Sequence, residues 1–362
     1  MFWYNNTMLD WIRSQELKRT NFIPRRIELS ETSLMLYGPP ASGKSALLLD
    51  YAYEHSHDSL FIDLADIRLD GWRPSLEELE LFCQKHKIHT LLIDNYDGSF
   101  PFPQDIRSFV ASRDPYPTPF PLIRLLPPDF EESLAFLPTK LQGYPDQAFG
   151  QLLREGMLPE ILLSQEGRRI SRLQELIRLH LPDTLARTLF LFVARHTGHR
   201  FTIHQLYTRL KEKLRLSKDK LYEQTTLLEQ RSMILACPKL GQPQAPKKLY
   251  PYDIGYTLAA SPTRDPSKLI ETLVMLELVK SNITPYYTDA LDFVDFANDT
   301  AFLIQPFIPP EQIRGRIFRL YGDILALGLS RLVVITAGID EEFDFEGVHC
   351  DIKPFWTWRL GM

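Results

Sequence analysis

Short continuous runs of apolar residues, separated by stretches with a helical period, characterise the first third of the chain. Five of these runs predict buried strands, at residues 33–37, 60–64, 89–94, 110–113 and 122–126. Between them the sequence predicts an amphipathic helix at 75–86 and a further helix near 104–109. Strands that are apolar on both faces and alternate with helices are typical of a parallel sheet covered on both sides, so we expect an α/β fold.

The spacing of apolar residues becomes mainly helical after residue 128. Residues 129–136 combine an acidic first turn with apolar positions three and four apart, which predicts a helix. Three more helices are expected near 184–196, 203–214 and 218–230, followed by two strands at 233–237 and 248–250. A second α/β unit is expected after these, with helices at 266–280 and 311–327 and strands at 292–296, 301–305 and 331–336.

The composition describes a globular protein, with 24% charged and 44% hydrophobic residues. No apolar run approaches the roughly 20 residues that span a bilayer, and the first residues lack the plan of a signal peptide. The three cysteines, Cys83, Cys237 and Cys350, show neither a metal-binding spacing nor a paired framework. We therefore expect a cytoplasmic protein without a membrane partner.

Residues 38–45 read GPPASGKS and match the phosphate-binding pattern G-x-x-x-x-G-K-[ST]. The pattern lies between the predicted strand 33–37 and an apolar helix that begins at Ser45, which is the required order of strand, loop and helix. Backbone N–H groups of such a loop surround phosphates, Lys44 supplies a positive charge and the Ser45 hydroxyl is a Mg²⁺ ligand. The predicted nucleotide-binding residues are Gly38, Pro39, Pro40, Ala41, Ser42, Gly43, Lys44 and Ser45.

A second carboxylate for the metal is expected at the end of a neighbouring strand, and Asp94 follows the apolar run 90–93. Many ATPases place Glu directly after this Asp, whereas the chain has Asn95, which cannot accept the proton of an attacking water. Asp97 is a substitute base, and Arg113 at the end of the next strand is a candidate sensor of the terminal phosphate. The predicted catalytic residues are Lys44, Asp94, Asn95, Asp97 and Arg113, and the predicted metal ligands are Ser45 and Asp94.

Positive charge is concentrated between residues 195 and 248. This segment holds twelve Lys and Arg against four Asp and Glu, a net charge of +8, which leaves −13 for the rest of a chain whose total is −5. Helices that enter a DNA groove need such charges for the phosphates. Candidate DNA contacts are Lys218, Lys220, Lys239, Lys247 and Lys248. The three helices expected at 184–230 and the two strands after them read as a winged helix, and winged helices also dock proteins, so a protein partner stays open.

Several phrases along the chain resemble those of a known family. They are LPPDFEESL at 126–134, EGMLPE at 155–160, KKLYPYDIG at 247–255, ETLVMLEL at 271–278 and VDF at 294–296. With the loop at 38–45, they make the chain similar, over nearly its whole length, to bacterial and archaeal AAA-type P-loop ATPases with a C-terminal domain of uncharacterised function. The resemblance implies a P-loop core at 1–128, a helical lid at 129–175, a winged helix at 176–252 and a PD-(D/E)XK restriction-endonuclease-like domain at 253–362.

In the nuclease-like fold, the resemblance implies a metal site built by Glu271, Asp295 and a carboxylate or amide followed two residues later by Lys. The chain departs from that pattern, because Pro306 and Phe307 follow Gln305. Without this Lys a hydroxide beside the metal is poorly stabilised. We therefore expect the C-terminal domain to be inactive as a nuclease.

Together these features predict a Mg²⁺-dependent ATP-binding protein of the AAA type with slow hydrolysis, whose nucleotide state is coupled to a basic winged helix that contacts DNA. One alternative is a nucleotide-gated switch for DNA or protein with negligible hydrolysis. A metal-dependent nuclease is the less favoured alternative. An oligomer that completes the site with an arginine from a neighbouring subunit is compatible with the sequence.

Overall fold

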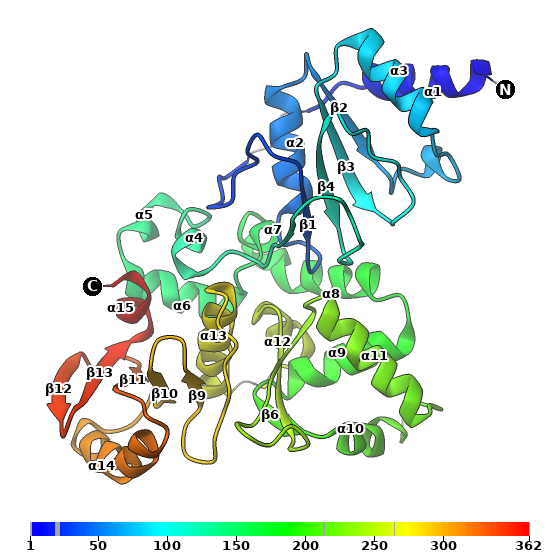
Figure 1. The fold of residues 1–362 in the computed structure, drawn as a ribbon. Coiled ribbons are helices and arrows are strands. Elements are labelled where there is room, and N and C mark those ends of the chain that lie inside the picture. Colours follow the sequence, from blue (N-terminus) through cyan, green and yellow to red (C-terminus); the bar gives the residue numbers. More distant parts are fainter. Residues whose placement is uncertain (1, 19–21, 213, 264, 362) are drawn as a thin grey trace. The chain divides into compact units, whose positions relative to one another are not determined.

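The structure is a computed structural model that describes residues 2–18, 22–212, 214–263 and 265–361. The chain forms two compact units, Met1–Pro127 and Pro128–Met362, each of which can be followed in Figure 1. The finer division at residues 175 and 252 stays a prediction. Within the described ranges, no helix is both long enough and apolar enough to cross a membrane.

The first unit is built around a five-stranded sheet in the order β2-β3-β4-β1-β5. Every pair of neighbouring strands in it is parallel. Its strands are β1 (Leu34–Tyr37), β2 (Ser59–Asp63), β3 (Thr90–Tyr96), β4 (Arg107–Ser112) and β5 (Leu122–Arg124). Its helices are α1 (Phe2–Ser14), α2 (Lys44–Glu54), the short 3-10 helix η1 (Ile67–Leu69) and α3 (Leu76–His86). The α/β class with a parallel sheet is therefore confirmed.

Side chains that alternate along each strand divide the core of this unit into two layers. Leu36, Leu92 and Phe109 pack on α2. Met35 and Val110, from the intervening positions, belong to the layer under α1 and α3. Figure 1 shows α2 on one side of the sheet and α1 and α3 on the other. Burial on both faces explains why the strands read as continuous apolar runs.

The helix expected near residues 104–109 is wrong. Residues 104–106 form a turn and a bend, and strand β4 begins at Arg107. Strand β4 lies between β3 and β1, and Ser108 to Ser112 are all buried. Pairing on both edges therefore decides the conformation of this stretch, in which three consecutive apolar residues fit a buried strand as well as a helix.

The second unit contains twelve helices within the described residues and two sheets. The helices are α4 (Phe130–Leu134), α5 (Thr139–Gln142), α6 (Pro145–Glu155), α7 (Pro159–Leu162), α8 (Arg169–His180), α9 (Thr184–Arg195), α10 (Ile203–Leu210), α11 (Lys218–Gln230), α12 (Gly255–Ala260), α13 (Pro266–Lys280), α14 (Pro310–Ala326) and α15 (Phe355–Leu360). A 3-10 turn, η2 (Glu166–Arg168), precedes α8. The predicted helices at 184–196, 218–230, 266–280 and 311–327 are confirmed to within one residue at each end.

The middle of the second unit combines α9, α10 and α11 with a three-stranded antiparallel sheet. The strands are β6 (His199–Phe201), β7 (Ile234–Cys237) and β8 (Lys247–Pro251), in the order β6-β8-β7. Strands β7 and β8 were expected, whereas β6 has only three residues and too short a pattern to be recognised. Thr202 caps the following helix α10 with a reciprocal capping box to Gln205.

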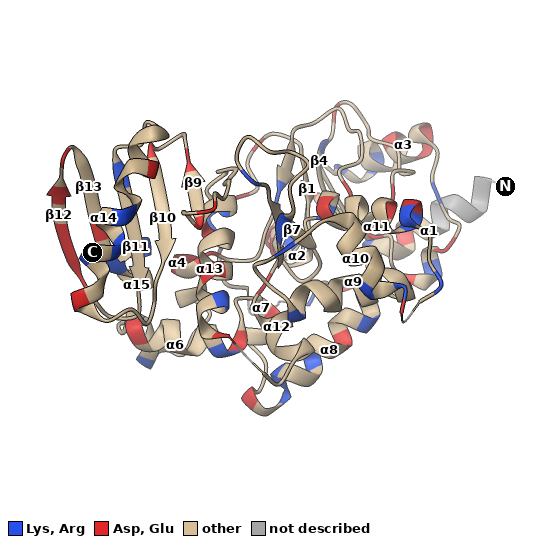
Figure 2. Ribbon diagram, turned by 90° about the horizontal axis from the view of Figure 1, so that it is seen from below, with Lys and Arg blue, Asp and Glu red and all other residues tan. Residues whose placement is uncertain are grey.

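The C-terminal sheet has the order β12-β13-β11-β10-β9 and mixes parallel and antiparallel pairs. Its strands are β9 (Phe293–Asp295), β10 (Thr300–Ile304), β11 (Arg331–Thr336), β12 (Glu341–Phe345) and β13 (Val348–Pro354). Helix α14 covers one face through Ile313, Ile317 and Ile324. Strand β12 escaped the sequence analysis because it is an acidic edge strand, which Figure 2 shows in red.

Buried carboxylates join residues 129–175 to the later part of the same unit. Asp253 accepts hydrogen bonds from the backbone N–H of Met157 at 2.7 Å and of Gly255 at 2.7 Å. Glu277 on α13 accepts from the backbone N–H of Phe130 at 2.9 Å. These bonds fix the first helices of the second unit against α12 and α13.

Candidate functional site

The glycine-rich loop at residues 38–45 leaves the carboxyl end of β1 and leads into α2. Gly38 and Gly43 have φ angles of 145° and 101°, and Ala41 also has a positive φ of 58°. A Cβ on Gly38 would lie 2.4 Å from the carbonyl oxygen of Leu125, so only glycine fits there. The loop therefore curls tightly over the N-terminus of α2, where backbone N–H groups without helical partners favour an anion.

Lys44 lies inside this loop rather than in solvent. Its ammonium donates to the carbonyl oxygens of Gly38 at 2.9 Å and Pro39 at 2.7 Å, and to Ser42 Oγ at 3.3 Å. Burial lowers the pKa of Lys44 to about 7, with Asp94 opposing this shift and Arg113 adding to it. The lysine is thus held by neutral carbonyls and makes no direct ion pair with a carboxylate among the described residues.

Asp94 lies in β3, two strands away from β1 in the sheet, and only 5% of the residue is exposed. Burial raises the pKa of Asp94, while a hydrogen bond with the Ser45 side chain lowers it. The structure therefore brings Ser45 and Asp94 into contact, as the sequence predicts. Two oxygen ligands in contact beside a phosphate-binding loop suit Mg²⁺.

Asn95 occupies an irregular position in the sheet. The pairing of β3 with β4 shifts register between Ile93 and Tyr96, and Asn95 has a φ of 55°. Its side-chain amide donates to Asp63 Oδ1 at 2.8 Å, and its backbone N–H donates to Asp94 Oδ1 at 2.9 Å. Asn adopts this left-handed conformation more readily than Glu, so the bulge itself favours Asn here.

The remaining two catalytic candidates have different surroundings. Asp97 forms an ion pair with Arg73 and accepts from the Ser99 hydroxyl at 2.5 Å. Burial acts to raise the pKa of Asp97, but the bonds from Ser99 and Arg73 hold it below its usual value. A carboxylate so engaged is a poor base. Arg113 follows β4 directly and is close enough to Lys44 to lower the pKa of that lysine.

Two residues that the sequence analysis did not single out also shape this edge. Arg25 is buried and donates to the carbonyl oxygens of Ser42 at 2.7 Å and Leu126 at 3.1 Å. Asp63 pairs in register with Asp94 and raises the pKa of Asp94 by its charge. Asp63 was recognisable as a second carboxylate ending an apolar strand, whereas no local pattern marks Arg25.

The lysines of the basic segment in the second unit are of two kinds, those that form ion pairs and those that are exposed to solvent. Lys239 pairs with Asp289 at 2.7 Å, and Lys247 with Glu229 at 3.4 Å. Lys218 and Lys220 are exposed at the start of α11, whose N-cap is Ser217. Lys213, which contributes to the predicted charge, lies outside the described residues.

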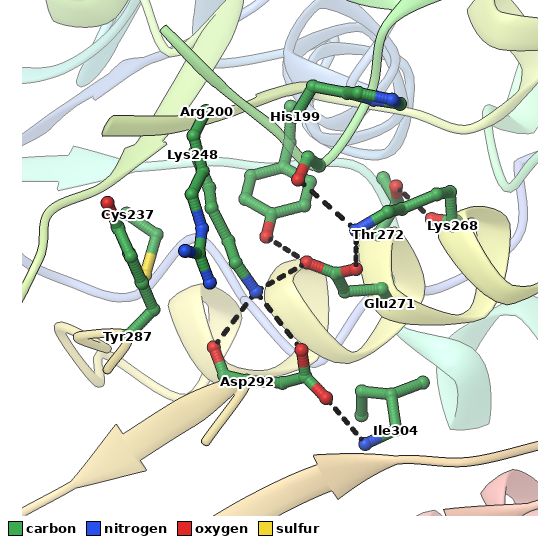
Figure 3. A network of polar contacts seen from close by, with 12 residues as sticks. His199, Arg200, Cys237, Lys248, Lys268, Glu271, Thr272, Tyr287, Asp292 and Ile304 are labelled. Carbon is green, nitrogen blue, oxygen red and sulfur yellow. Dashed lines mark hydrogen bonds and ion pairs between the residues drawn. The ribbon is translucent and has the colours of Figure 1, made fainter. Parts of the chain in front are cut away.

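The assignment of Lys248 to a DNA contact is wrong, because its side chain is 3% exposed. Its ammonium lies 2.8 Å from Glu271 Oε1 and 3.2 Å from Asp292 Oδ1 (Figure 3). Burial acts to lower the pKa of Lys248, yet the two carboxylates hold it above its usual value. Lys248 therefore joins β8 to α13 and to the residue before β9.

The two acidic residues of the nuclease-like pattern are hydrogen-bonded to other residues of the second unit. Glu271 accepts from Lys268 at 2.6 Å and from the Tyr250 hydroxyl at 2.7 Å, in addition to Lys248. Asp295 accepts from the backbone N–H of Ala297 at 2.9 Å and from the Asn298 amide at 2.6 Å. With their oxygens occupied in this way, both carboxylates serve the packing of the second unit.

No protein-family model matches the chain, and no curated protein shows significant similarity to it. The solved structures similar to it include the Walker-type ATPase PABY2304 of Pyrococcus abyssi (14% identity, 64% of this chain and 91% of that chain, TM-score 0.42). They also include the Holliday junction branch migration motor RuvB of Thermotoga maritima (14% identity, 60% and 84%, TM-score 0.31). The Orc1 protein of Aeropyrum pernix in complex with DNA is a third (11% identity, 70% and 89%, TM-score 0.27).

Proposed function

We propose that the chain is a Mg²⁺-dependent ATP-binding protein of the AAA type with slow hydrolysis. The observation that carries the proposal is the arrangement of Lys44, Ser45 and Asp94. The lysine ammonium is held inside the glycine-rich loop by two carbonyl oxygens, and Ser45 contacts the buried Asp94 beside it.

The residues at this edge of the sheet fit both a triphosphate and a magnesium ion. The loop N–H groups at the start of α2 and the charge of Lys44 would hold the phosphates. Ser45 would hold the metal directly, and Asp94 would hold it directly or through its water shell. Magnesium supplies charge neutralisation of the phosphate oxygens when bound. Asp94 is buried and its pKa is raised, so a bound magnesium ion would give its carboxylate a positive partner.

Slow hydrolysis follows from the surroundings of the two residues that could act on the attacking water, Asn95 and Asp97. Asn95 carries no base and is turned toward Asp63, while Asp97 is ion-paired with Arg73. Arg113, beside Lys44, is left to orient the terminal phosphate. This chain is therefore better equipped to hold ATP than to cleave it quickly.

The test compares ATP binding by the wild type, Lys44→Ala and Lys85→Ala, a matched removal of an exposed lysine on α3. We expect Lys44→Ala to weaken binding of Mg²⁺-ATP by at least about tenfold, since charge-assisted phosphate contacts are the strong ones. Lys85→Ala is expected to bind as the wild type does. Equal affinity in all three proteins would overturn the assignment of the site.

The exposed basic start of α11 supports a second part of the proposal, contact with DNA. Helices α9, α10 and α11 with strands β6, β7 and β8 have the element order of a winged helix, and α11 is the helix that would enter a groove. Lys218 and Lys220 lie in its first turn, with Lys211 and Arg215 exposed just before it. The N-terminal end of a helix also attracts phosphate.

DNA binding is tested by titrating duplex DNA at several salt concentrations. Removing Lys218 and Lys220 together should lower the slope of log affinity against log salt by roughly 2, because each phosphate contact releases about one counterion. Lys247→Ala, which removes a lysine already paired with Glu229, is the control and should leave most of the slope. An unchanged slope in the double variant favours the protein-docking alternative.

The same preparations distinguish an ATPase from a switch with negligible hydrolysis. We expect phosphate release to be slow and to disappear in Lys44→Ala. Release that is indistinguishable between the two proteins, together with nucleotide-dependent DNA affinity in the wild type alone, would identify the switch.

A further inference from the structure

A hollow of about 470 Å³ lies among helices α8, α9 and α12 of the second unit. Arg178 on α8 and Arg187 and Arg195 on α9 line it, and no Asp or Glu is among its lining residues. Basic residues of α8 and α9 can be followed as blue segments in Figure 2. Three guanidinium groups around one hollow repel one another, so the arrangement favours an anion between them.

The acidic residues nearest in sequence are already engaged elsewhere. Glu175, on the same helix as Arg178, pairs with Arg172 at 2.8 Å. Asp183 caps α9 by accepting from the backbone N–H of Ala186 at 2.8 Å. In the part of the chain that the structure describes, neither carboxylate forms an ion pair with an arginine of the hollow.

The arginines themselves keep donors available. One terminal nitrogen of Arg187, Nη1, donates hydrogen bonds to the carbonyl oxygens of Leu181 and Pro182, at 3.0 and 3.2 Å. Arg195 donates its Nε to the carbonyl oxygen of Ala260 at 2.9 Å, which fixes the side chain and leaves its terminal nitrogens for a ligand. Arg178 is exposed, and it has no hydrogen bond or ion pair with any other described residue.

The rest of the lining is apolar except for Gln174, whose side-chain amide donates to the carbonyl oxygen of Ala259 at 3.1 Å. Ile177, Leu191 and the side chains of Ala259 and Ala260 belong to it. A volume of about 470 Å³ is in the range of small-molecule sites. Guanidinium forks match the oxygens of a phosphate group, and several forks at once suit a phosphate dianion better than a single carboxylate.

We propose that this hollow, termed the arginine hollow, binds a phosphate monoester about the size of a nucleotide, with an apolar face such as that of a base. The phosphate lies between Arg178, Arg187 and Arg195, and the apolar part lies on Ile177 and Leu191. The site is separate in sequence from the loop at residues 38–45, so it gives the second unit a ligand of its own.

The experiment titrates AMP and inorganic phosphate into the full chain carrying Lys44→Ala, so that binding at the glycine-rich loop is weakened. Arg178→Ala is the first variant, because its side chain has no partner among the described residues whose loss would destabilise the fold. Arg187→Lys retains the charge and loses the fork. Arg319→Ala, which removes an exposed arginine of α14, is the matched control.

We expect AMP to bind more tightly than inorganic phosphate, and Arg178→Ala to weaken AMP by roughly tenfold. Arg187→Lys should also weaken it, and Arg319→Ala should not. Absence of AMP binding, or equal AMP binding by all variants, overturns the proposal. If a single-stranded oligonucleotide binds in an Arg178-dependent way and AMP does not, the hollow contacts nucleic acid and the small-ligand proposal falls.

Discussion

Lys44 in the first unit and Lys248 in the second both extend into the interior of the protein, and the two lysines are held in opposite ways. Lys44 in the first unit is surrounded by carbonyl oxygens, and burial lowers its pKa to about 7. Lys248 in the second unit lies between Glu271 and Asp292, which hold its pKa above the usual value although burial opposes them. The nearby carboxylates differ correspondingly, since the pKa of Asp94 is raised and that of Glu271 is lowered.

This contrast separates a binding site from a structural ion pair. The charges around Lys248 are already compensated within the protein, so the lysine has nothing left to offer a ligand. Lys44 and Asp94 both carry the cost of burial without a full partner, which a triphosphate and a divalent cation would provide. The burial of a lysine does not by itself distinguish a binding site from a structural ion pair. The groups that surround its ammonium do.

Removal of Lys248, the lysine that is paired with carboxylates, should have the largest effect on stability. Lys248→Met leaves the buried Glu271 and the partly buried Asp292 without their shared partner, and we expect a loss of about 3–5 kcal/mol in the free energy of unfolding. Lys247→Met, one residue away and paired with Glu229 at a half-exposed site, should cost less than about 1 kcal/mol. Urea unfolding, followed by a signal from the second unit, measures the free energy of unfolding of both variants.

A combined variant sharpens this comparison. Lys248→Met with Glu271→Leu should recover part of the loss, because fewer buried carboxylates then lack a partner. Equal stability of Lys248→Met and Lys247→Met would show that the ion pair contributes nothing and would remove the contrast between the two lysines.

The glycine-rich loop around Lys44 can be distorted by a substitution that leaves the lysine in place. Gly38→Ala forces a Cβ toward the carbonyl oxygen of Leu125 at a φ of 145°, and we expect a cost of about 2–3 kcal/mol together with loss of ATP binding. Gly315→Ala is the control, since a Cβ there meets no atom within 4 Å and lies in α14. That change should stabilise by roughly 0.5–1 kcal/mol. Thermal unfolding and ATP titration of each variant provide the readouts.

The lowered pKa of Lys44 predicts a pH dependence with a definite sign. Between pH 7 and about 10 the unfolded chain binds the proton that the folded lysine has lost, so the stability of the wild type without nucleotide rises with pH. Lys44→Met lacks this rise, which amounts to at most about 1.4 kcal/mol per pH unit. Parallel slopes for the two proteins would contradict the lowered pKa.

The smallest expected effect concerns the bulge beside Asp94. Asn95→Gly should be nearly neutral because glycine accepts a φ of 55°, whereas Asn95→Glu should cost about 1 kcal/mol and add a carboxylate beside Asp63. We expect no large gain in ATP hydrolysis from Asn95→Glu, because residue 95 is directed toward Asp63. A marked increase in the rate of ATP hydrolysis, measured as phosphate release, would show that Asn95 alone is the cause of slow hydrolysis.

The sequence was most informative where the chemistry is encoded locally. The loop at residues 38–45 contains its glycines, lysine and hydroxyl within eight positions, and Asp94 follows a recognisable apolar run. Lys248 was misassigned because its burial depends on Glu271 and Asp292, which are distant in sequence and reach it only through the packing of α13. The same limit applies to β4, β6 and the arginine hollow, each of which is defined by its neighbours in space.

The central claim, that Lys44 awaits an anion, is tested most directly by calorimetric titration of Mg²⁺-ATP at pH 8 in two buffers with different ionisation enthalpies. At this pH most Lys44 side chains are neutral without ligand, since burial lowers their pKa to about 7. Bound phosphates restore the charge, so the wild type should take up about one proton per ATP, and Lys44→Ala should take up none and bind weakly. Binding without proton uptake by the wild type, or undiminished affinity in Lys44→Ala, would contradict the account.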